Sequence, residues 1–363
     1  MKKLLIGSMV CASVVMAWPF TPHNTNNFSK YTNPADAKLR KEALENDLIP
    51  IPTDKSKLQK YIQINTKDNP LNPAKIELGK KLYFDPRISR SGLISCNTCH
   101  NLSMGGVDGI PVAIGHKWAP NPHHLNSPTV YNSVFFIKQF WDGRVTTLAE
   151  QAGGPSTAHV EMASTAKDIE AFLNSIPTYV NEFRESFNGE KPTFENFTKA
   201  VAAFEATLIT PSRYDDYLNG DDNALTPEEK KGLKTFIAVG CTDCHSDIAL
   251  GGTRMETFPQ LDDFKYENVG DYKGNKKGET KVPTLRNITE TAPYFHNGTV
   301  WSLREATEIM ANTQLGMNLS KEQLDSIVTF LKALDGRKPK IDIPQLPVRT
   351  DKTPVPQPDL NLK

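Results

Sequence analysis

Two short cysteine boxes constrain the fold of this 363-residue chain more than any other feature. Each box has two cysteines separated by two residues and followed directly by a histidine, in Cys96-Asn97-Thr98-Cys99-His100 and in Cys241-Thr242-Asp243-Cys244-His245. This spacing is typical of covalent attachment of a c-type haem, in which each thiol adds to a vinyl group and the histidine binds the iron. A zinc knuckle or a redox dithiol would need the cysteine pair but not the adjacent histidine. The sequence therefore predicts two covalently bound haems, attached through Cys96, Cys99, Cys241 and Cys244 and ligated by His100 and His245.

Residues 1–17 have the pattern of a secretory signal peptide. Two lysines precede an apolar run from Leu4 to Val15, and Val15-Met16-Ala17 offers a cleavage site. The run is too short to cross a bilayer comfortably. Processing as a lipoprotein at Cys11 is the alternative, but the residues before it lack the small side chain that this processing requires. We therefore expect an exported, periplasmic protein, which agrees with haem attachment outside the cytoplasm.

Charge and length limit the classes of partner and the number of domains. The chain has 42 basic residues (Lys and Arg) and 42 acidic residues (Asp and Glu), so nothing in its charge favours nucleic acid or an anionic membrane as a partner. No stretch after the signal peptide is long enough for a transmembrane helix. Hydrophobic residues make up 38% of the chain, which is enough for packed cores, and 363 residues are typical of two domains.

A similar helical start precedes each cysteine box. Asn72-Pro73 predicts a helix start before the first box, and Asp85-Pro86 ends that helix. Thr226-Pro227 predicts a second start, and Gly240 ends that helix directly before the second box. The repeated order of helix, loop and box indicates duplication of one haem unit. Because strand signals are weak throughout, we expect an all-α fold of two cytochrome-c-like haem domains packed side by side.

The expected domains follow from these two units. Residues 18–70 are a polar N-terminal extension, expected to be flexible or draped over the fold, in which Lys38–Asn46 could make a short helix. Residues 71–210 form the first haem domain, joined by the extended, proline-rich tail 338–363, and residues 211–337 form the second.

Several other segments have helical or connecting character. The segments with helical periodicity are Ala166–Phe187 and Phe194–Leu208, the candidate crossing between domains is Leu208–Gly220, and the candidate capping boxes are Ser302 with Glu305 and Ser320 with Gln323, the last helix ending at Gly336.

The second axial ligand of each iron decides what a haem can do. A methionine raises the potential and suits electron transfer, a second histidine lowers it, and an open position allows peroxide or dioxygen chemistry. His116 lies within loop reach of the first box. Spacing alone does not choose among the other candidates, which are His23, His123, His124, His159, His296, Met255, Met310 and Met317.

Further motifs follow one another without interruption between Ile76 and Gly336. They are CNTCHNLSMGGVDG (Cys96–Gly109), IGHKW (Ile114–Trp118), NSPTVYN (Asn126–Asn132), FWDGR (Phe140–Arg144), AEQAGGP (Ala149–Pro155), VEM (Val160–Met162), VPTLRNI (Val282–Ile288) and TAPYFHNGTVWSL (Thr291–Leu303). Together these motifs resemble those of the bacterial di-haem cytochrome c peroxidases. The resemblance implies a periplasmic enzyme that reduces hydrogen peroxide to water.

The resemblance implies unequal roles for the two haems. The first would be the low-potential, peroxidatic haem, with His100 as proximal ligand and His116 as a distal ligand that is released when the other haem is reduced. The second would be the high-potential haem that accepts electrons, ligated by His245 and Met310. Trp141 would lie between the two haems on the electron route.

The resemblance also assigns the peroxide chemistry. Glu161 matches the acid–base residue of the peroxide pocket, and Gln151 matches the polar residue near it. Heterolytic cleavage of a peroxide needs a proton taken from one oxygen and returned to the other, which one positioned glutamate can perform. Two irons hold two reducing equivalents, which matches the two-electron reduction of peroxide to water.

A calcium site and the protein partners are further implications of the resemblance. Asn126, with the backbone oxygens of Thr291 and Pro293, matches the family's interdomain calcium site, and oxygen ligands suit calcium. The expected partners are hydrogen peroxide and a small c-type cytochrome or cupredoxin as electron donor, and the family tends to form homodimers. The chain departs from the family in Ala119–Leu125, which contains His123 and His124 and is about two residues longer than usual.

Two other functions would need different residues. A non-enzymatic di-haem electron carrier would need no acid–base residue near the first haem, and Glu161 argues against it. A relative that oxidises a protein substrate, as the di-haem maturation enzymes of methylamine dehydrogenase do, would carry tyrosine in place of the axial methionine. Met310, fourteen residues after His296, favours the peroxidase.

Overall fold

The computed structural model describes residues 33–358, so the signal peptide expected at residues 1–17 lies outside the described residues. Helices dominate this part of the chain, and its only regular strands are one short antiparallel pair, β1 (Met255–Thr257) and β2 (Glu279–Lys281). The expected predominance of helix is confirmed. Within the same residues, no helix is long and apolar enough to cross a membrane.

The α-helices of the described residues are α1 (Pro34–Glu45), α2 (Lys55–Asn65), α3 (Pro73–Phe84), α4 (Cys96–Cys99), α5 (Leu148–Thr157), α6 (Ala166–Asn174), α7 (Pro177–Ser186), α8 (Phe194–Glu205), α9 (Arg213–Leu218), α10 (Pro227–Ala238), α11 (Leu303–Leu315) and α12 (Lys321–Leu331). The short 3-10 helices are η2 (Pro86–Ile88), η3 (His116–Trp118), η4 (Ser133–Phe135), η5 (Cys241–Asp243), η6 (Ile288–Glu290) and η7 (Lys332–Leu334).

Helices α3 and α8 form the centre of the first half of the molecule, which ends at residue 210. The Asn72 side chain caps α3 by accepting a hydrogen bond from the backbone N of Lys75, and Pro73 occupies the first turn, as expected. At the crossing with α8, a Cβ on Gly79 would lie 1.9 Å from the backbone oxygen of Ala200. Only glycine permits this approach, because any side chain would overlap the backbone of α8. The apolar side chains around the crossing form one buried core with α6 and α7.

Helices α10 and α12 cross in the same way in the second half, from residue 211 onward. A capping box starts α10 at Thr226, as expected. A Cβ on Gly232 would lie 2.2 Å from the backbone oxygen of Ser326. Phe204 of α8 and Phe330 of α12 contact the glycines of the two crossings. The unit of helix, loop and box is therefore present twice, and both copies use one glycine at their main helix crossing.

A Pro-Thr-x-x-Asn loop follows each box and forms a second repeated element. Thr129 in the first copy donates its hydroxyl to the backbone oxygen of Gly105 at 2.7 Å. Thr284 in the second copy donates its hydroxyl to the backbone oxygen of Ala249 at 2.5 Å. Each threonine thus holds the segment that follows its own box against the loop.

The asparagines of these two loops meet at the segment that connects the halves. Asn132 and Asn287 both have left-handed backbone, with φ of 63° and 59°. Their side-chain amides both donate to Thr210 Oγ1, at 2.8 and 2.9 Å, and all three residues are fully buried. Beside them, Asp215 and Arg286 form a bidentate buried ion pair at 2.8 and 2.9 Å. The crossing is therefore a polar, tightly bonded part of the interior.

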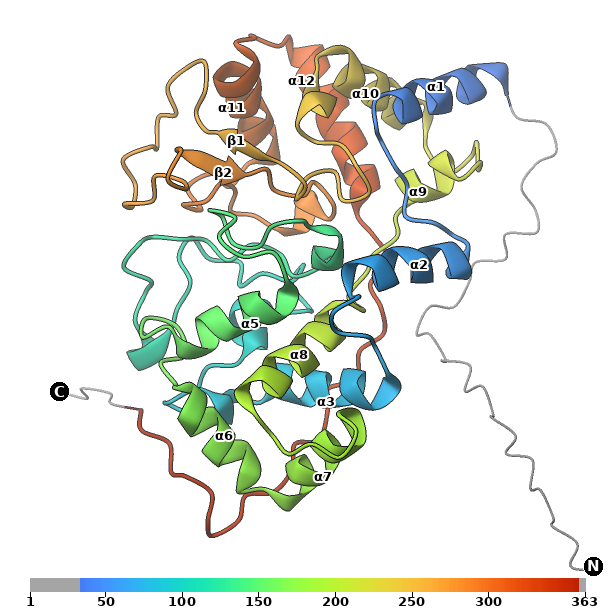
Figure 1. Ribbon diagram of the computed structural model, residues 1–363. Coiled ribbons are helices and arrows are strands. Elements are labelled where there is room, and N and C mark those ends of the chain that lie inside the picture. Colours follow the sequence, from blue (N-terminus) through green and yellow to red (C-terminus); the bar gives the residue numbers. More distant parts are fainter. Residues whose placement is uncertain (1–32, 359–363) are drawn as a thin grey trace, which may run out of the picture.

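Figure 1 shows the helices of the two halves as two groups. Helices α3 and α5–α8 lie in the lower group, and α9–α12 with both strands lie in the upper group. The tail after residue 338 runs back from α12 to the lower group. There Arg87 donates to the backbone oxygen of Pro347 at 2.8 Å, and Thr350 donates to that of Ser175 at 3.0 Å.

The N-terminal segment differs from the expectation of a flexible or draped extension. Residues 34–65 contain α1 and α2, and the first of these helices covers the alternative considered at Lys38–Asn46. Leu39 and Ala43 of α1 enter the core of the second half, and Leu58 and Ile62 of α2 enter a smaller cluster around Val134 and Phe135. The expectation is wrong for residues 34–65, because two apolar side chains about one turn apart fix each polar helix to the core.

Two expected helical features differ in the structure, and the expected crossing contains a helix of its own. Ala166–Phe187 is two helices, because Pro177 lacks the backbone N–H needed inside a helix and instead begins α7. The crossing Leu208–Gly220 contains a helix, α9. Ser302 caps α11, but Glu305 pairs with Lys265 at 2.6 Å instead of closing the box.

Candidate active site

The first cysteine box forms α4, a single helical turn bonded to α3. A capping box closes the turn at its N-terminal end. Tyr83 of α3 is fully buried and donates its hydroxyl to the backbone oxygen of His100 at 2.6 Å. Cys96 and Cys99 form no disulfide, so both thiols are available one turn apart. The box therefore has the local geometry needed to attach a porphyrin edge.

The two box histidines are oriented in the same way. His100 Nδ1 lies 2.9 Å from the backbone oxygen of Pro128, and His245 Nδ1 lies 3.3 Å from that of Leu250. A ring that donates Nδ1–H to a carbonyl presents Nε2 to a metal. Burial lowers the pKa of both imidazoles, that of His245 to about 4, which favours the neutral form that an iron ligand must have.

The loop that carries His116 packs against the first box and against the segment around Glu161. Cys99 Sγ lies 3.7 Å from the backbone oxygen of Ile114. His116 is buried, and its backbone N donates to the backbone oxygen of Glu161 at 2.7 Å. A Cβ on Gly115 would lie 2.0 Å from the backbone oxygen of Val160. The two loops are therefore in direct backbone contact beside the box.

The His116 loop is locally strained. Lys117 and Trp118 have φ of 63° and 57°, in the left-handed region. Each such residue costs about 1 kcal/mol or more when it is not glycine. Trp118 is also 60% exposed, so little burial of its ring offsets the strain. A change in the conformation of this loop would release that strain.

Glu161 lies within electrostatic range of the first box. Burial raises the pKa of the Glu161 carboxyl, whereas the charges of Arg144 and His123 lower it. Burial raises the pKa of the Cys99 thiol to about 12, with further contributions from Asp108 and Glu161. The structure therefore brings Glu161, the His116 loop and the first box together at one place.

Two other residues from the sequence motifs lie near Glu161. Gln151 lies half-buried on α5, the helix that leads into the Glu161 segment, and its amide has no hydrogen bond to another residue within 33–358. Arg144 stacks on the Phe140 ring at 3.5 Å and pairs with Asp142 at 2.9 Å. These contacts hold the guanidinium close enough to act on the Glu161 carboxylate.

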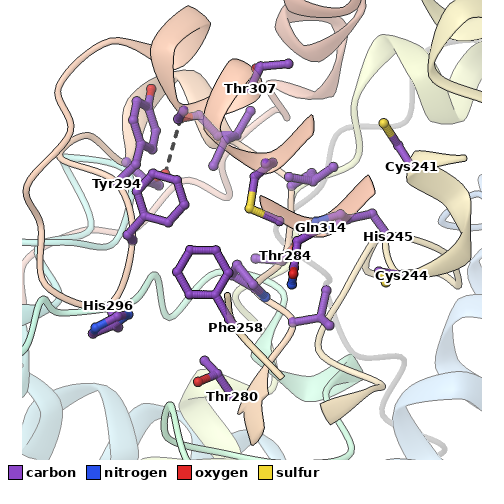
Figure 2. A pocket seen from close by; sticks show the side chains of 18 of the residues that line it. Cys241, Cys244, His245, Phe258, Thr280, Thr284, Tyr294, His296, Thr307 and Gln314 are labelled. Carbon is purple, nitrogen blue, oxygen red and sulfur yellow. Dashed lines mark hydrogen bonds between the residues drawn. The ribbon is translucent and has the colours of Figure 1, made fainter. Parts of the chain in front are cut away.

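The second box opens into a cavity lined mainly by apolar side chains. Cys241, Cys244 and His245 lie on one side of this cavity, and Tyr294 and His296 lie on the opposite side (Figure 2). Other residues that line it are Phe236, Phe258, Leu285, Leu303, Ile327 and Leu331. An apolar slot beside a cysteine pair and a neutral histidine fits a covalently attached haem.

Met310 is the methionine that the structure brings to this cavity. It lies on α11 and lines the cavity together with His245. Met255 lies in β1 and Met317 is 39% exposed after the end of α11, and neither is among the lining residues. Sequence spacing alone does not select the axial ligand among these three methionines.

Trp141 belongs to the first half but lines the cavity of the second box. Its Nε1 donates to the backbone oxygen of Asn126 at 2.9 Å, and its own backbone oxygen accepts from the backbone N of Lys281 at 2.7 Å. Its ring centre lies 6.4 Å from that of His296, in an edge-on arrangement. Trp141 is therefore fixed where the two halves meet.

The three residues expected at a calcium site, Asn126, Thr291 and Pro293, all line the same cavity. The buried Asn126 amide donates to the backbone oxygen of Ile110 at 2.9 Å, in the first half. Its backbone N donates to the backbone oxygen of His296 at 2.8 Å, in the second half. Asn126 thus connects the halves beside the second box.

Three charged residues near the boxes were missed from the sequence. Asp108 lies within electrostatic range of His100. Lys281 is 5% exposed and lines the second cavity. Glu205 is 4% exposed at the end of α8 and acts electrostatically on Cys96. No short motif marks these residues. For Glu205, however, the sequence does place an acidic residue where the apolar periodicity of α8 predicts a buried side chain.

Comparison with known proteins gives a consistent assignment. The sequence model of the family described as di-haem cytochrome c peroxidase matches residues 73–223. The cytochrome c551 peroxidase of Pseudomonas aeruginosa is 46% identical over 79% of this chain and 86% of that protein. The cytochrome c551 peroxidase of Nitrosomonas europaea is 44% identical over 80% of this chain and 88% of that protein. Among solved structures, the chain is similar to the crystal structure of a MauG-like protein associated with microbial copper homeostasis, with a TM-score of 0.66 and 27% sequence identity. The match covers 74% of this chain and 91% of the chain of the MauG-like protein.

The duplicated helical unit with its two cysteine–histidine boxes indicates a di-haem c-type cytochrome. The similarity over most of the length then gives the family. The chain belongs to the di-haem cytochrome c peroxidases, which are oxidoreductases that act on peroxide.

Proposed function

We propose that the chain reduces hydrogen peroxide to water in the periplasm, with electrons from a small c-type cytochrome or a cupredoxin. The names of its relatives support peroxide as the substrate and a small cytochrome as the donor. The signal pattern at residues 1–17 supports export. Two haems in one chain hold the two electrons that the reduction needs, although the donor delivers them singly.

The first box would hold the peroxidatic haem, with His100 as the permanent ligand of its iron and His116 as the removable one. When bound, a haem supplies an iron that exchanges electrons and, with a free coordination position, binds peroxide. The neutral, tethered ring of His100 suits permanent ligation. The strained backbone at Lys117 and Trp118 supports movement of the loop that carries His116.

Glu161 is the proton-transfer residue at the first box. It takes a proton from one peroxide oxygen and returns it to the other. Burial raises the pKa of its carboxyl, which brings protonation closer to neutral pH and so makes both directions of transfer accessible. Gln151 on the adjacent α5 is proposed to orient the peroxide by hydrogen bonding.

The second box would hold the electron-accepting haem, with His245 and Met310 as the residues that bind its iron. This haem would accept electrons from the donor, and Trp141 would lie on the route from it to the first. The place of Trp141 in the wall of the second cavity, with its indole bonded to Asn126 of the first half, supports this route.

We place a calcium ion between the halves, bound by Asn126 and the backbone oxygens of Thr291 and Pro293. Amide and carbonyl oxygens suit calcium, and all three residues lie beside one cavity. Chelation should weaken coupling between the halves and lower turnover, and unchanged turnover in calcium-free protein would count against this site.

Residues 71–210 with the tail 338–363 act as the peroxidatic domain, and residues 211–337 act as the electron-transfer domain, packed side by side. The two separate helix crossings support this division. Two copies of the chain form a homodimer, which sedimentation of the haem-loaded protein tests: a single monomeric species would exclude it.

The alternative is a di-haem enzyme that oxidises a protein substrate. The similarity to a solved MauG-like protein is the reason to keep it. Met310 occupies the position at which such maturation enzymes carry tyrosine, and its place in the second cavity favours the peroxidase. A non-enzymatic electron carrier would have no use for Glu161 beside the first box.

The meeting of Glu161, the His116 loop and Cys99 carries this proposal. To test it, half-reduced protein is mixed with hydrogen peroxide in a stopped-flow instrument and the spectra of both haems are followed. The wild type should consume peroxide, and Glu161→Gln should lose about 100-fold or more of its turnover with both haem spectra unchanged. Glu185→Gln, on the exposed face of α7, is the control for loss of one carboxylate. Full turnover in Glu161→Gln would remove Glu161 from the mechanism, and no peroxide uptake by the wild type would overturn the function.

A further inference from the structure

The two main helix crossings place an acidic residue and an apolar residue at equivalent positions. Cβ atoms on the two crossing glycines would lie 3.0 Å from the Cβ of Phe204 in α8 and 2.7 Å from the Cβ of Phe330 in α12. The next residue is Glu205 in α8 and Leu331 in α12. Both are buried, with 4% of each exposed. The two copies of the repeat therefore carry an acidic residue and an apolar residue at positions where their backbones are equivalent.

Both positions lie next to a haem box. Leu331 lines the cavity of the second box. Burial, and then the charge of Glu205, raises the pKa of the Cys96 thiol in the first box. Burial, Cys96 and Glu205, in that order, raise the pKa of Tyr83, whose hydroxyl binds the backbone oxygen of His100. Glu205 therefore acts electrostatically on the attachment turn of the first haem.

One oxygen of the buried Glu205 carboxyl is unpaired. Among residues 33–358, no hydrogen bond reaches its Oε2. Burial raises the pKa of Glu205 to about 8. The positive charge of a ferric haem would lower this pKa again, so the carboxyl would be ionised beside the oxidised haem and would bind a proton when that charge is removed by reduction. Among residues 33–358, the charge of Glu205 raises the pKa of Tyr83 from α3 and of Cys96 from α4, and neither of these groups is a cation. The pKa of an unpaired buried carboxyl shifts strongly when a nearby charge changes.

We propose that Glu205 binds a proton when the first haem is reduced, and that its charge in the oxidised state keeps the potential of this haem below that of the second. The inference rests on the proposed haem at the first box. In this coupling, one electron from the donor protein reduces the iron and one proton from solvent binds the Glu205 carboxylate, so the net charge of the pair does not change. Leu331 has no proton to exchange, so the second haem lacks this coupling.

The direction of the effect follows from electrostatics. An ionised carboxylate stabilises the ferric state relative to the ferrous state and so lowers the potential. Reduction removes one positive charge from the iron, so the carboxyl then holds its proton more tightly. By linkage, the potential falls as the pH rises through the range in which Glu205 is protonated only in the reduced state. Outside that range, where the protonation of Glu205 does not change on reduction, the potential is flat.

Spectroelectrochemical titration of the haem-loaded protein from about pH 5 to about pH 9 tests the coupling. In the wild type, the potential of the first haem should fall with rising pH more steeply than that of the second. Glu205→Gln removes the ionisable group and should raise the first-haem potential at high pH and flatten its pH dependence. Glu205→Leu, which copies the residue of the second half, should give the same result. Glu195→Gln, an exposed acidic residue of the same helix, should leave both potentials unchanged.

A pH-independent first-haem potential in the wild type would overturn the inference without any variant. An unaltered pH dependence in Glu205→Gln would overturn it as well. Haem content and peroxide turnover are measured on the same samples to separate this result from the proposed function. A protein that attaches two haems and reduces peroxide, but whose first-haem potential ignores pH, would overturn the role of Glu205 alone, whereas a wild type without covalent haem would overturn both.

Discussion

His116 and Met310 are the proposed distal ligands of the two halves, and they differ in the kind of backbone that carries them. His116 lies on a loop with two consecutive left-handed residues, Lys117 and Trp118. Met310 lies within α11, where its backbone is held by hydrogen bonds on both sides. A change in the backbone of a strained loop can carry its ligand away from the iron at low cost, whereas the backbone of a ligand inside a helix stays in place. Under the proposed ligation, the comparison teaches that a repeated unit makes a switching site in one half and a permanent site in the other when the backbone of its distal segment changes.

The same comparison extends to charge. Glu205 in the first half corresponds to Leu331 in the second, at the same helix crossing. Asn126 lies two residues before the Pro-Thr loop of the first half, and Lys281 lies two residues before that of the second. The crossing glycines, the box and the loop threonines are shared, because they set the backbone. The two pairs that differ, Glu205 with Leu331 and Asn126 with Lys281, are buried. They give the two haem sites different electrostatic environments.

Met310→His should have the largest effect on the difference between the halves. A second histidine lowers the potential of a haem, so the second haem should no longer be reduced before the first, and activation should be lost. A redox titration followed by visible spectra measures this directly. Met317→His, at an exposed position after α11, should leave both potentials in place. If Met310→His left the second potential unchanged, the axial ligand would have to be reassigned to Met255 or Met317.

Gly79→Ala and Gly232→Ala should each lower the free energy of unfolding by about 3 kcal/mol, because the new methyl would overlap the backbone of the crossing helix. Thermal unfolding followed at the absorbance of each haem should show the first haem affected by one variant and the second by the other. Gly153→Ala is the control, since its Cβ would meet its nearest atom at an ordinary 3.5 Å, and it should stabilise α5 slightly. Tolerance of alanine at either crossing would contradict the shared architecture.

Thr210→Val should cost about 2 kcal/mol, because the amides of Asn132 and Asn287 would lose their common buried acceptor. Since these asparagines belong to different halves, the variant should also reduce the cooperativity of unfolding between the two haems. Denaturant unfolding monitored at both haems measures the two effects. Thr157→Val, at an exposed position on α5, is the control and should change little. Fully cooperative unfolding in Thr210→Val would show that other contacts join the halves.

Arg144→Gln should have the smallest effect, a shift of the pH–rate profile. Arg144 lowers the pKa of the Glu161 carboxyl, so its removal should let that pKa rise. In the proposed mechanism the reaction begins with proton uptake by the ionised carboxylate, so the acidic limb of kcat/KM should move to higher pH. Arg144→Lys should keep most of the wild-type profile because the charge remains. A shift to lower pH would mean that Glu161 does not start as the base.

Much of the fold could be predicted from local sequence signals, and the errors have a common cause. Asn72-Pro73 and Thr226-Pro227 start helices through caps that involve residues only a few positions away. The N-terminal helices were missed because their few apolar residues are stabilised by distant parts of the chain, such as Leu39 in the core of the second half. Pro177 divides a segment whose apolar periodicity continues on both sides.

The sequence by itself determined the chemistry that depends on adjacent residues: the thiol pair and histidine of each box, the caps of the helices and the duplication of the unit. The tertiary structure decided which methionine reaches the second cavity, where Trp141 meets the opposite half, and that Glu205 is buried and unpaired beside the first box. The physical reason is range. Covalent attachment and helix capping act within one turn, whereas axial ligation, burial and the electrostatics of a buried charge depend on residues brought together from across the chain.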